Sequence, residues 1–194
     1  HTRDNQRLEF YSFDKYLFKP EHFKKLVSAH TELSEYIIEY ESNYPKNIEG
    51  IQKISLFKGR IILNLILGDI SSTQSYLEQI DTIDAWFFDG FSPSKNPELW
   101  TKQLFSKINN SCHADSTFST YSSSGYVKKN LKDAGFSYEK VKGFSHKRHM
   151  LRGLSSSRKE KTSIQGLKVA VIGSGIAGCT LSYFLSKQGI EVDL

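Results

Sequence analysis

Short apolar segments alternate with amphipathic segments along most of the sequence, and this alternation limits the fold more than any other feature. Strands are predicted at residues 8–13, 83–89, 116–122 and 137–144, and a last strand or extended segment at 147–154. Segments with helical spacing of apolar residues lie at 19–30, 31–45, 71–80, 96–108 and 125–136. Strands that alternate with helices predict a parallel α/β sheet. No helix separates the last two of these segments, so they are predicted to pair antiparallel.

Local signals add detail to this pattern. Ile54–Phe57 turn through Lys58 and Gly59 into Ile61–Leu67, which predicts a hairpin. The segment 71–80 is predicted to be a helix capped by Ser71 or Ser72, and 96–108 is predicted to be one helix with Pro97 in its first turn. The predicted fold class is α/β, with a Rossmann-like sheet that ends in an antiparallel strand pair.

A glycine-rich motif near the C-terminal end predicts a second nucleotide-binding unit. Val169–Ile172 form an apolar strand, and a helical segment at 179–189 follows. Between them, the spacing G-x-G-x-x-G places backbone N–H groups and a helix N-terminus where a pyrophosphate binds. The candidate cofactor-binding residues are Gly173, Gly175, Ile176, Ala177 and Gly178. The glycines do not distinguish FAD from NAD, and a strand–turn–helix without a ligand is the alternative.

The residues between these two units are small, polar and charged, which is typical of a linker. The predicted organisation is a first domain at 1–153, a linker at 154–166 and the start of a second domain at 167–194. The sequence begins with His1, and Leu194 lies inside an apolar alternation. We therefore expect it to be a segment of a longer chain.

Positive charge is concentrated near this linker. The chain has a net charge of +5, and the stretch from Lys140 to Lys161 contains one acidic residue, Glu160. A local excess of lysine and arginine attracts polyanions such as nucleic acids. A solvated linker also needs charge, so both interpretations stay open on charge alone.

The stretch from Asp84 to Trp100 carries the strongest chemical signal. A hydrophobic strand delivers Asp89 to its C-terminal end, where open α/β sheets bind ligands. A carboxylate there can hold or deprotonate an amine that accepts a methyl group, and Phe91 can stack on a flat substrate. The candidate substrate-binding residues of this loop are Phe91, Pro93, Lys95 and Asn96. The alternative is a structural loop in which Asp89 accepts hydrogen bonds at a helix start.

Four segments of the sequence resemble those of a known family. They are "DAWFFDGFSPSKNPELWTKQLF", "STFSTYSSSGYVKKNLKDAGF", "KVKGFSHKRHML" and "VAVIGSGIAG". From about Phe10 to Leu194 the chain resembles the bifunctional tRNA 5-methylaminomethyl-2-thiouridine biosynthesis proteins (MnmC). The resemblance implies an S-adenosyl-L-methionine-dependent methyltransferase domain joined to an FAD-dependent oxidase. It also implies that a first methyltransferase strand and its glycine-rich loop precede Leu8, so the sheet is expected to be incomplete at its N-terminus.

The same resemblance implies roles for individual residues. The oxidase removes the carboxymethyl group from 5-carboxymethylaminomethyl-uridine at the tRNA wobble position, and the methyltransferase then methylates the exposed aminomethyl group. Asp14 matches the acid that contacts the ribose of the methyl donor, Asp69 the acid near its adenine, and Asp89 the catalytic acid. Lys147 and Arg148 are candidate contacts to the tRNA anticodon region. Tyr121 and Tyr126 either stack on bases or pack in the interior.

Several classes of function are disfavoured. No apolar run approaches the 18 or so residues of a membrane helix. His146 and His149 have no third ligand nearby, so no metal site is predicted. Cys112 and Cys179 match no ligand spacing and are expected to be free thiols, which fits a cytoplasmic protein.

Two other functions compete with the bifunctional enzyme. A stand-alone FAD- or NAD-dependent oxidoreductase with an unrelated N-terminal domain would not need the Asp89 loop. An RNA-binding module that uses the basic stretch would leave three acids at strand ends, Asp14, Asp69 and Asp89, without a role.

Overall fold

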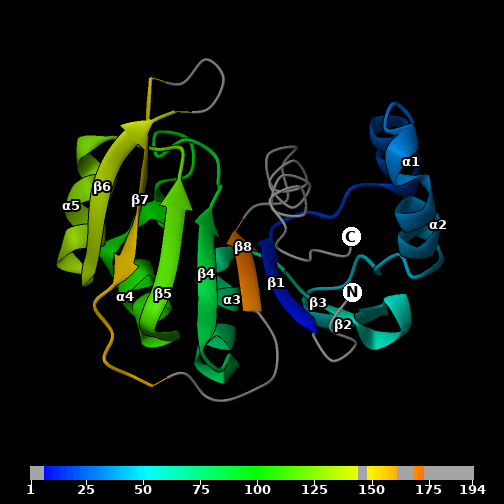
Figure 1. Ribbon diagram of the computed structural model, residues 1–194. Coiled ribbons are helices and arrows are strands. Elements are labelled where there is room, and N and C mark those ends of the chain that lie inside the picture. The colour runs from blue at the N-terminus through cyan, green and yellow to red at the C-terminus, as the bar shows by residue number, and fades with distance from the viewer. Residues whose placement is uncertain (1–6, 144–147, 161–167, 173–194) are drawn as a thin grey trace.

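The computed structural model describes residues 7–143, 148–160 and 168–172 (Figure 1). Its described strands form one eight-stranded sheet in the order β2-β3-β1-β8-β4-β5-β7-β6. The strands are β1 Leu8–Asp14, β2 Gly50–Leu56, β3 Ile61–Leu67, β4 Ile83–Phe88, β5 Cys112–Thr120, β6 Phe136–Lys142, β7 His149–Ser155 and β8 Lys168–Ile172.

The helices are short and stand between the strands in the chain. The α-helices are α1 Pro20–Val27, α2 Ser34–Ser42, α3 Ile70–Thr73, α4 Lys102–Asn110 and α5 Gly125–Asp133. The 3₁₀ helices are η1 Thr31–Leu33, η2 Phe57–Gly59, η3 Gln74–Gln79 and η4 Pro97–Trp100. Figure 1 shows α3, α4 and α5 behind the sheet, whereas α1 and α2 lie at its β2–β3 end.

The predicted α/β class and the terminal strand pair are confirmed. β1 pairs with β3, and β4 with β5, in parallel. β7 pairs antiparallel with both β5 and β6. The predicted hairpin is also present, because β2 and β3 pair antiparallel from Leu56 opposite Ile61. Its turn is tight: Phe57 and Lys58 both have positive φ angles, of 51° and 56°.

The main core lies between the sheet and helices α3 to α5. Alternate residues of β4, Trp86 and Phe88, point to this side and are almost fully buried. Phe88 packs against Phe105 of α4, with ring centroids 5.1 Å apart, and against Phe118 of β5 at 5.5 Å. The period-2 burial of β4 therefore fixes which face of the strand the helices cover, and it directs Phe87 to the opposite face.

Two predicted helix starts are wrong. Asp69, rather than Ser71 or Ser72, caps α3, because its side chain accepts the backbone N–H of Ser71. The segment 96–108 is two elements, η4 and α4, separated by Thr101 in an extended conformation. Thr101 accepts the N–H of Leu104 and so starts a new helix at Lys102.

Strand β8, which precedes the glycine motif, belongs to the same sheet as the other described strands. It lies between β1 and β4 and pairs in parallel with both. A strand in this position satisfies the backbone groups that face each other from β1 and β4, and these groups would otherwise be unpaired in the middle of the sheet. The glycine motif and the helical segment after it lie outside the described residues, so the second domain stays a prediction.

The first part of the predicted linker is attached to the sheet. β7 continues to Ser155, past the expected boundary at 153. Beyond it, the Ser157 hydroxyl donates to the carbonyl of Cys112 at 2.8 Å, and the N–H of Ala114 donates to the carbonyl of Lys159 at 3.0 Å. These bonds hold residues 156–160 along the start of β5.

Substitution of Gly153 by alanine is expected to destabilise the sheet. Gly153 lies in β7, where an added Cβ would stand 2.8 Å from Cα of Tyr138 and closer still to the carbonyl oxygen of Ser137. Backbone atoms cannot move aside without separating β6 from β7, so we expect a loss of about 1–3 kcal/mol. Urea unfolding measures this loss. Gly125→Ala is the control, because nothing lies within 4 Å of an added Cβ there. Equal midpoints for the two variants would contradict this account.

Candidate functional site

Four neighbouring strands end at the same edge of the sheet. Phe13, Ile172, Phe88 and Thr120 lie side by side in the parallel register of β1, β8, β4 and β5. β1 ends at Asp14, and Asp89 directly follows β4. Because neighbouring strands are about 4.8 Å apart, Asp14 and Asp89 lie about 10 Å apart on either side of the end of β8. This position is the switch point of the sheet, where open α/β folds bind ligands.

Asp89 is half-buried, and burial raises the pKa of its carboxyl group to about 6. Among the described residues it makes no hydrogen bond or ion pair. Near neutral pH the group is therefore mostly ionised, and its oxygen atoms can accept hydrogen bonds from a ligand. Burial and the charge of Asp89 together raise the pKa of the nearby Tyr121 phenol.

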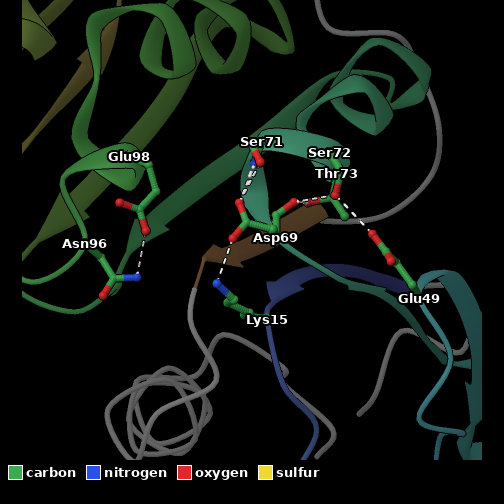
Figure 2. A network of polar contacts seen from close by, with 8 residues as sticks. All are labelled: Lys15, Glu49, Asp69, Ser71, Ser72, Thr73, Asn96 and Glu98. Atoms are coloured by element: carbon green, nitrogen blue, oxygen red, sulfur yellow. Dashed lines mark hydrogen bonds and ion pairs between the residues drawn. The ribbon is translucent and has the colours of Figure 1, made fainter.

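The loop after Asp89 presents an aromatic ring to solvent. The side chain of Phe91 is 72% exposed, which is unusual for a large apolar residue. Pro93 is half-buried and Lys95 is exposed. Asn96 donates from Nδ2 to Oε1 of Glu98 at 3.0 Å (Figure 2). The predicted substrate-binding residues of this loop therefore lie together at the edge of the sheet that carries Asp89.

The carboxylate of Asp69 forms hydrogen bonds and an ion pair within the protein. Its Oδ2 accepts Nζ of Lys15 at 2.8 Å, and its Oδ1 accepts the backbone N–H and the hydroxyl of Ser71 at 3.0 and 2.7 Å. These contacts, with Lys15 the largest contribution, hold the pKa of Asp69 well below its usual range. Figure 2 shows the ion pair joining the end of β1 to the start of α3. Contact with adenine stays a prediction for this residue.

Asp14 stands at the opposite side of β8 from Asp89. Its Oδ2 accepts the hydroxyl of Ser12 at 3.0 Å, and its carbonyl accepts the N–H of Gly68 at 2.9 Å. The second bond ties the end of β1 to the turn that leads to Asp69. The side chain is half-buried, and the bond from Ser12 holds its carboxylate at the end of β1.

The other predicted residues are placed as follows. Arg148 is exposed just before β7, on the side of the sheet where β5 ends, since Leu151 pairs with Thr120. Lys147, with the glycine-motif residues Gly173, Gly175, Ile176, Ala177 and Gly178, lies outside the described residues.

The two tyrosines differ in their surroundings. Tyr121 is half-buried, and its hydroxyl donates to the carbonyl of Gly90 at 2.7 Å. Tyr126, at the start of α5, is 48% exposed. Sequence reasoning missed the hydroxyl contact of Tyr121 and the ion pair of Lys15, because each joins residues at least 31 positions apart.

The described residues also bear on metal binding and on membrane insertion. No group of three or more His, Cys, Asp or Glu side chains in them could hold a metal ion. No helix among the same residues has the length and apolar character needed to cross a bilayer.

Comparison with known proteins identifies the class. Residues 31–156 match the family described as S-adenosyl-L-methionine-dependent methyltransferase. This match spans both the Asp89 loop and the terminal antiparallel strand pair. The chain therefore belongs to the S-adenosyl-L-methionine-dependent methyltransferase family.

Particular relatives share one name. The chain is 37% identical over 201 residues to the tRNA 5-methylaminomethyl-2-thiouridine biosynthesis bifunctional protein MnmC of Pseudoalteromonas translucida, and 36% identical over 187 residues to that of Nitrosospira multiformis. These matches cover 97% and 96% of this chain, which spans about 30% of the length of either relative. The crystal structure of MNMC2 from Aquifex aeolicus is similar with a TM-score of 0.56 and 29% identity, over 81% of this chain and 47% of that chain.

The raised pKa of Asp89 predicts that Asp89→Asn stabilises the fold above pH 6. The folded pKa of about 6 exceeds the unfolded value of about 3.9. The native state therefore binds the proton more tightly, and the stability of the unsubstituted protein falls as pH rises from about 4 to about 6. The pKa difference limits this loss of stability to about 3 kcal/mol. Solvent screening of the half-exposed carboxylate reduces the expected loss to about 1 kcal/mol.

Urea unfolding of both proteins between pH 4 and pH 8 measures this difference. We expect Asp89→Asn to gain stability over the unsubstituted protein as pH rises to 6, and no difference at pH 4. A variant that is less stable than the unsubstituted protein at pH 8 would show that Asp89 is a structural acceptor instead.

Proposed function

We propose that this chain forms the methyltransferase part of a tRNA-modifying enzyme, which converts 5-aminomethyl-2-thiouridine at the wobble position to 5-methylaminomethyl-2-thiouridine. One observation carries the proposal. In a chain of the methyltransferase family, Asp89 stands at the switch point with its carboxylate half-buried and without a partner among the described residues. The named relatives support the choice of substrate.

The residues at the switch point fit an adenosyl cofactor. S-adenosyl-L-methionine, when bound, supplies an electrophilic methyl group on a sulfonium centre. Asp14 would accept hydrogen bonds from the ribose hydroxyls, because its carboxylate is held at the end of β1 by the bond from Ser12. Asp69 would lie on the adenine side, where its contacts with Lys15 and Ser71 keep it ionised and in place.

Asp89 would act on the substrate amine. Methyl transfer to a primary amine leaves positive charge on nitrogen, and an ionised carboxylate stabilises that charge most strongly in a partly dehydrated site. Because Asp89 is half-buried and ionised near neutral pH, it can orient the neutral amine and balance the developing charge. The surrounding loop would increase the rate of methyl transfer further by positioning the amine.

The exposed groups around Asp89 suit a nucleic-acid substrate. Phe91 can stack on the flipped uracil ring, with Pro93 stiffening the loop. The polar and basic residues Lys95, Asn96, Lys147 and Arg148 are proposed to contact the anticodon region of tRNA. We place this reaction in the cytoplasm.

The second half of the bifunctional enzyme is also a proposal. We assign residues 1–153 to the methyltransferase domain, 154–166 to a linker and 167–194 to the start of an FAD-dependent oxidoreductase domain. The phosphate cradle would be formed by Gly173, Gly175, Ile176, Ala177 and Gly178. Such a domain would remove the carboxymethyl group from 5-carboxymethylaminomethyl-2-thiouridine. The alternative of a stand-alone FAD- or NAD-dependent oxidoreductase is not favoured, because the methyltransferase family match covers residues 31–156.

Asp89→Asn is expected to lower methyl transfer in the intact protein by at least about 100-fold, because the charge that stabilises the ammonium product is lost. The measurement is transfer of labelled methyl from S-adenosyl-L-methionine to tRNA that carries 5-aminomethyl-2-thiouridine. Asp133→Asn is the matched control, since Asp133 on α5 forms an ion pair with the exposed Lys129 at 3.3 Å. Equal rates for the two variants would reject the role of Asp89, and no transfer by the unsubstituted protein would reject the proposed function.

Asp14→Asn is expected to weaken binding of S-adenosyl-L-methionine by about 10- to 100-fold, because hydrogen bonds to a charged acceptor contribute about 1.5–3 kcal/mol. Isothermal titration calorimetry without tRNA measures the affinity. Asp89→Asn should bind the methyl donor within about threefold of the unsubstituted protein. If Asp89→Asn weakened binding of the methyl donor and Asp14→Asn did not, Asp89 rather than Asp14 would be the residue that binds the cofactor.

A further inference from the structure

The loop that carries Asp89 is held at two successive carbonyl groups. The Tyr121 hydroxyl donates to the carbonyl oxygen of Gly90 at 2.7 Å, and the indole Nε1 of Trp100 donates to that of Phe91 at 2.8 Å. These carbonyls belong to the two residues directly after Asp89. Both donors are side chains from other elements, because Tyr121 follows β5 and Trp100 ends η4.

The donors are themselves fixed. Trp100 is 1% exposed, and its own carbonyl accepts Nδ2 of Asn130 in α5 at 2.8 Å. Its ring meets that of Tyr121 edge to face, with centroids 6.0 Å apart and an interplanar angle of 86°. The ring of Phe105 in α4 stands 6.5 Å away on the same indole. The two donors therefore form one unit that is anchored in the core.

A third contact covers the backbone of the loop at Gly90. A Cβ added to Gly90 would lie 2.6 Å from Cδ1 of Leu99, so the side chain of Leu99 covers the backbone at this point. Leu99 and Trp100 are neighbours in η4, and together they hold the loop from one side. The loop nevertheless leaves Phe91 72% exposed and the Asp89 side chain without a hydrogen-bond partner among the described residues.

We propose that Trp100 and Tyr121 are positioning residues, which fix Asp89 and Phe91 by binding the carbonyls of Gly90 and Phe91. Bonds to the carbonyls of Gly90 and Phe91 hold the peptide planes on both sides of the Phe91 Cα. They set the direction in which Phe91 leaves the backbone and restrict movement of the chain directly after Asp89. Displacement of a catalytic group by about 1 Å costs up to about 100-fold in rate. The kinetic test of this inference rests on the proposed function, whereas the titration of Asp89 does not depend on it.

Trp100→Phe in the intact protein tests the proposal, because it keeps a buried ring and removes the N–H. We expect kcat for methyl transfer to fall at least about tenfold, with the affinity for S-adenosyl-L-methionine within about twofold. We also expect the pKa of Asp89, followed by carboxyl ¹³C NMR and assigned with Asp89→Asn, to fall from about 6 toward its value in an unstructured chain. A loosened loop exposes the carboxylate to water, and desolvation is the cause of the raised pKa.

Trp86→Phe is the matched control. Trp86 is equally buried, in β4, but its Nε1 has no hydrogen-bond partner among the described residues. The same substitution there removes core contacts without releasing the loop, so kcat and the pKa of Asp89 should stay close to those of the unsubstituted protein. If Trp100→Phe does not fold, Tyr121→Phe removes the other donor and should lower kcat about threefold.

Two outcomes would overturn the proposal. One is an equal fall in kcat for Trp100→Phe and Trp86→Phe, which indicates a general packing effect. The other is an unchanged pKa of Asp89 in Trp100→Phe. If the unsubstituted protein transfers no methyl group, the proposed function fails, but the NMR titration still decides whether Trp100 holds the loop.

Discussion

The site depends on the parallel pairing of β8 with β1 and β4. On one side lie β2, β3 and β1, and on the other β4, β5, β7 and β6; among the described strands, β8 alone pairs with both groups. Asp14 comes from the first group and Asp89 from the second. Backbone pairing along β8 therefore sets the separation of the two strand ends that carry these residues, and the shared register brings both to one edge.

Two carboxylates at this edge have opposite environments. Asp69 accepts hydrogen bonds from Lys15 and Ser71, which favour its charged form and lower its pKa. Asp89 has no such donors among the described residues, and burial alone raises its pKa. A carboxylate that is satisfied by the protein stabilises the scaffold, whereas one that is dehydrated and unsatisfied is suited to bind charge that develops on a substrate. The difference in partners thus explains why the pKa values of the two carboxyl groups shift in opposite directions.

Much of this fold could be predicted because its signals are local. The apolar run of β4, the turn at Lys58 and Gly59, and the antiparallel pairing of β6 with β7 were all predicted from short windows of sequence, and the structure confirms each. The helix starts at 69–71 and 101–102 were predicted wrongly, because several residues nearby can cap a helix and only the packed structure selects one. The sheet position of β8 was not predictable, since its partners are more than 80 residues away in the chain.

By itself, the sequence determined the strand and helix periods, the class of the fold and the presence of Asp89 directly after a buried strand, because these follow from neighbouring residues. Only the tertiary structure decided which strands from distant parts of the chain are adjacent, how deeply Asp89 is buried and which donors reach the carbonyls of Gly90 and Phe91. Those properties arise from contacts between distant segments. Tyr121 and Trp100, which form them, carry no sequence signal that links them to the loop.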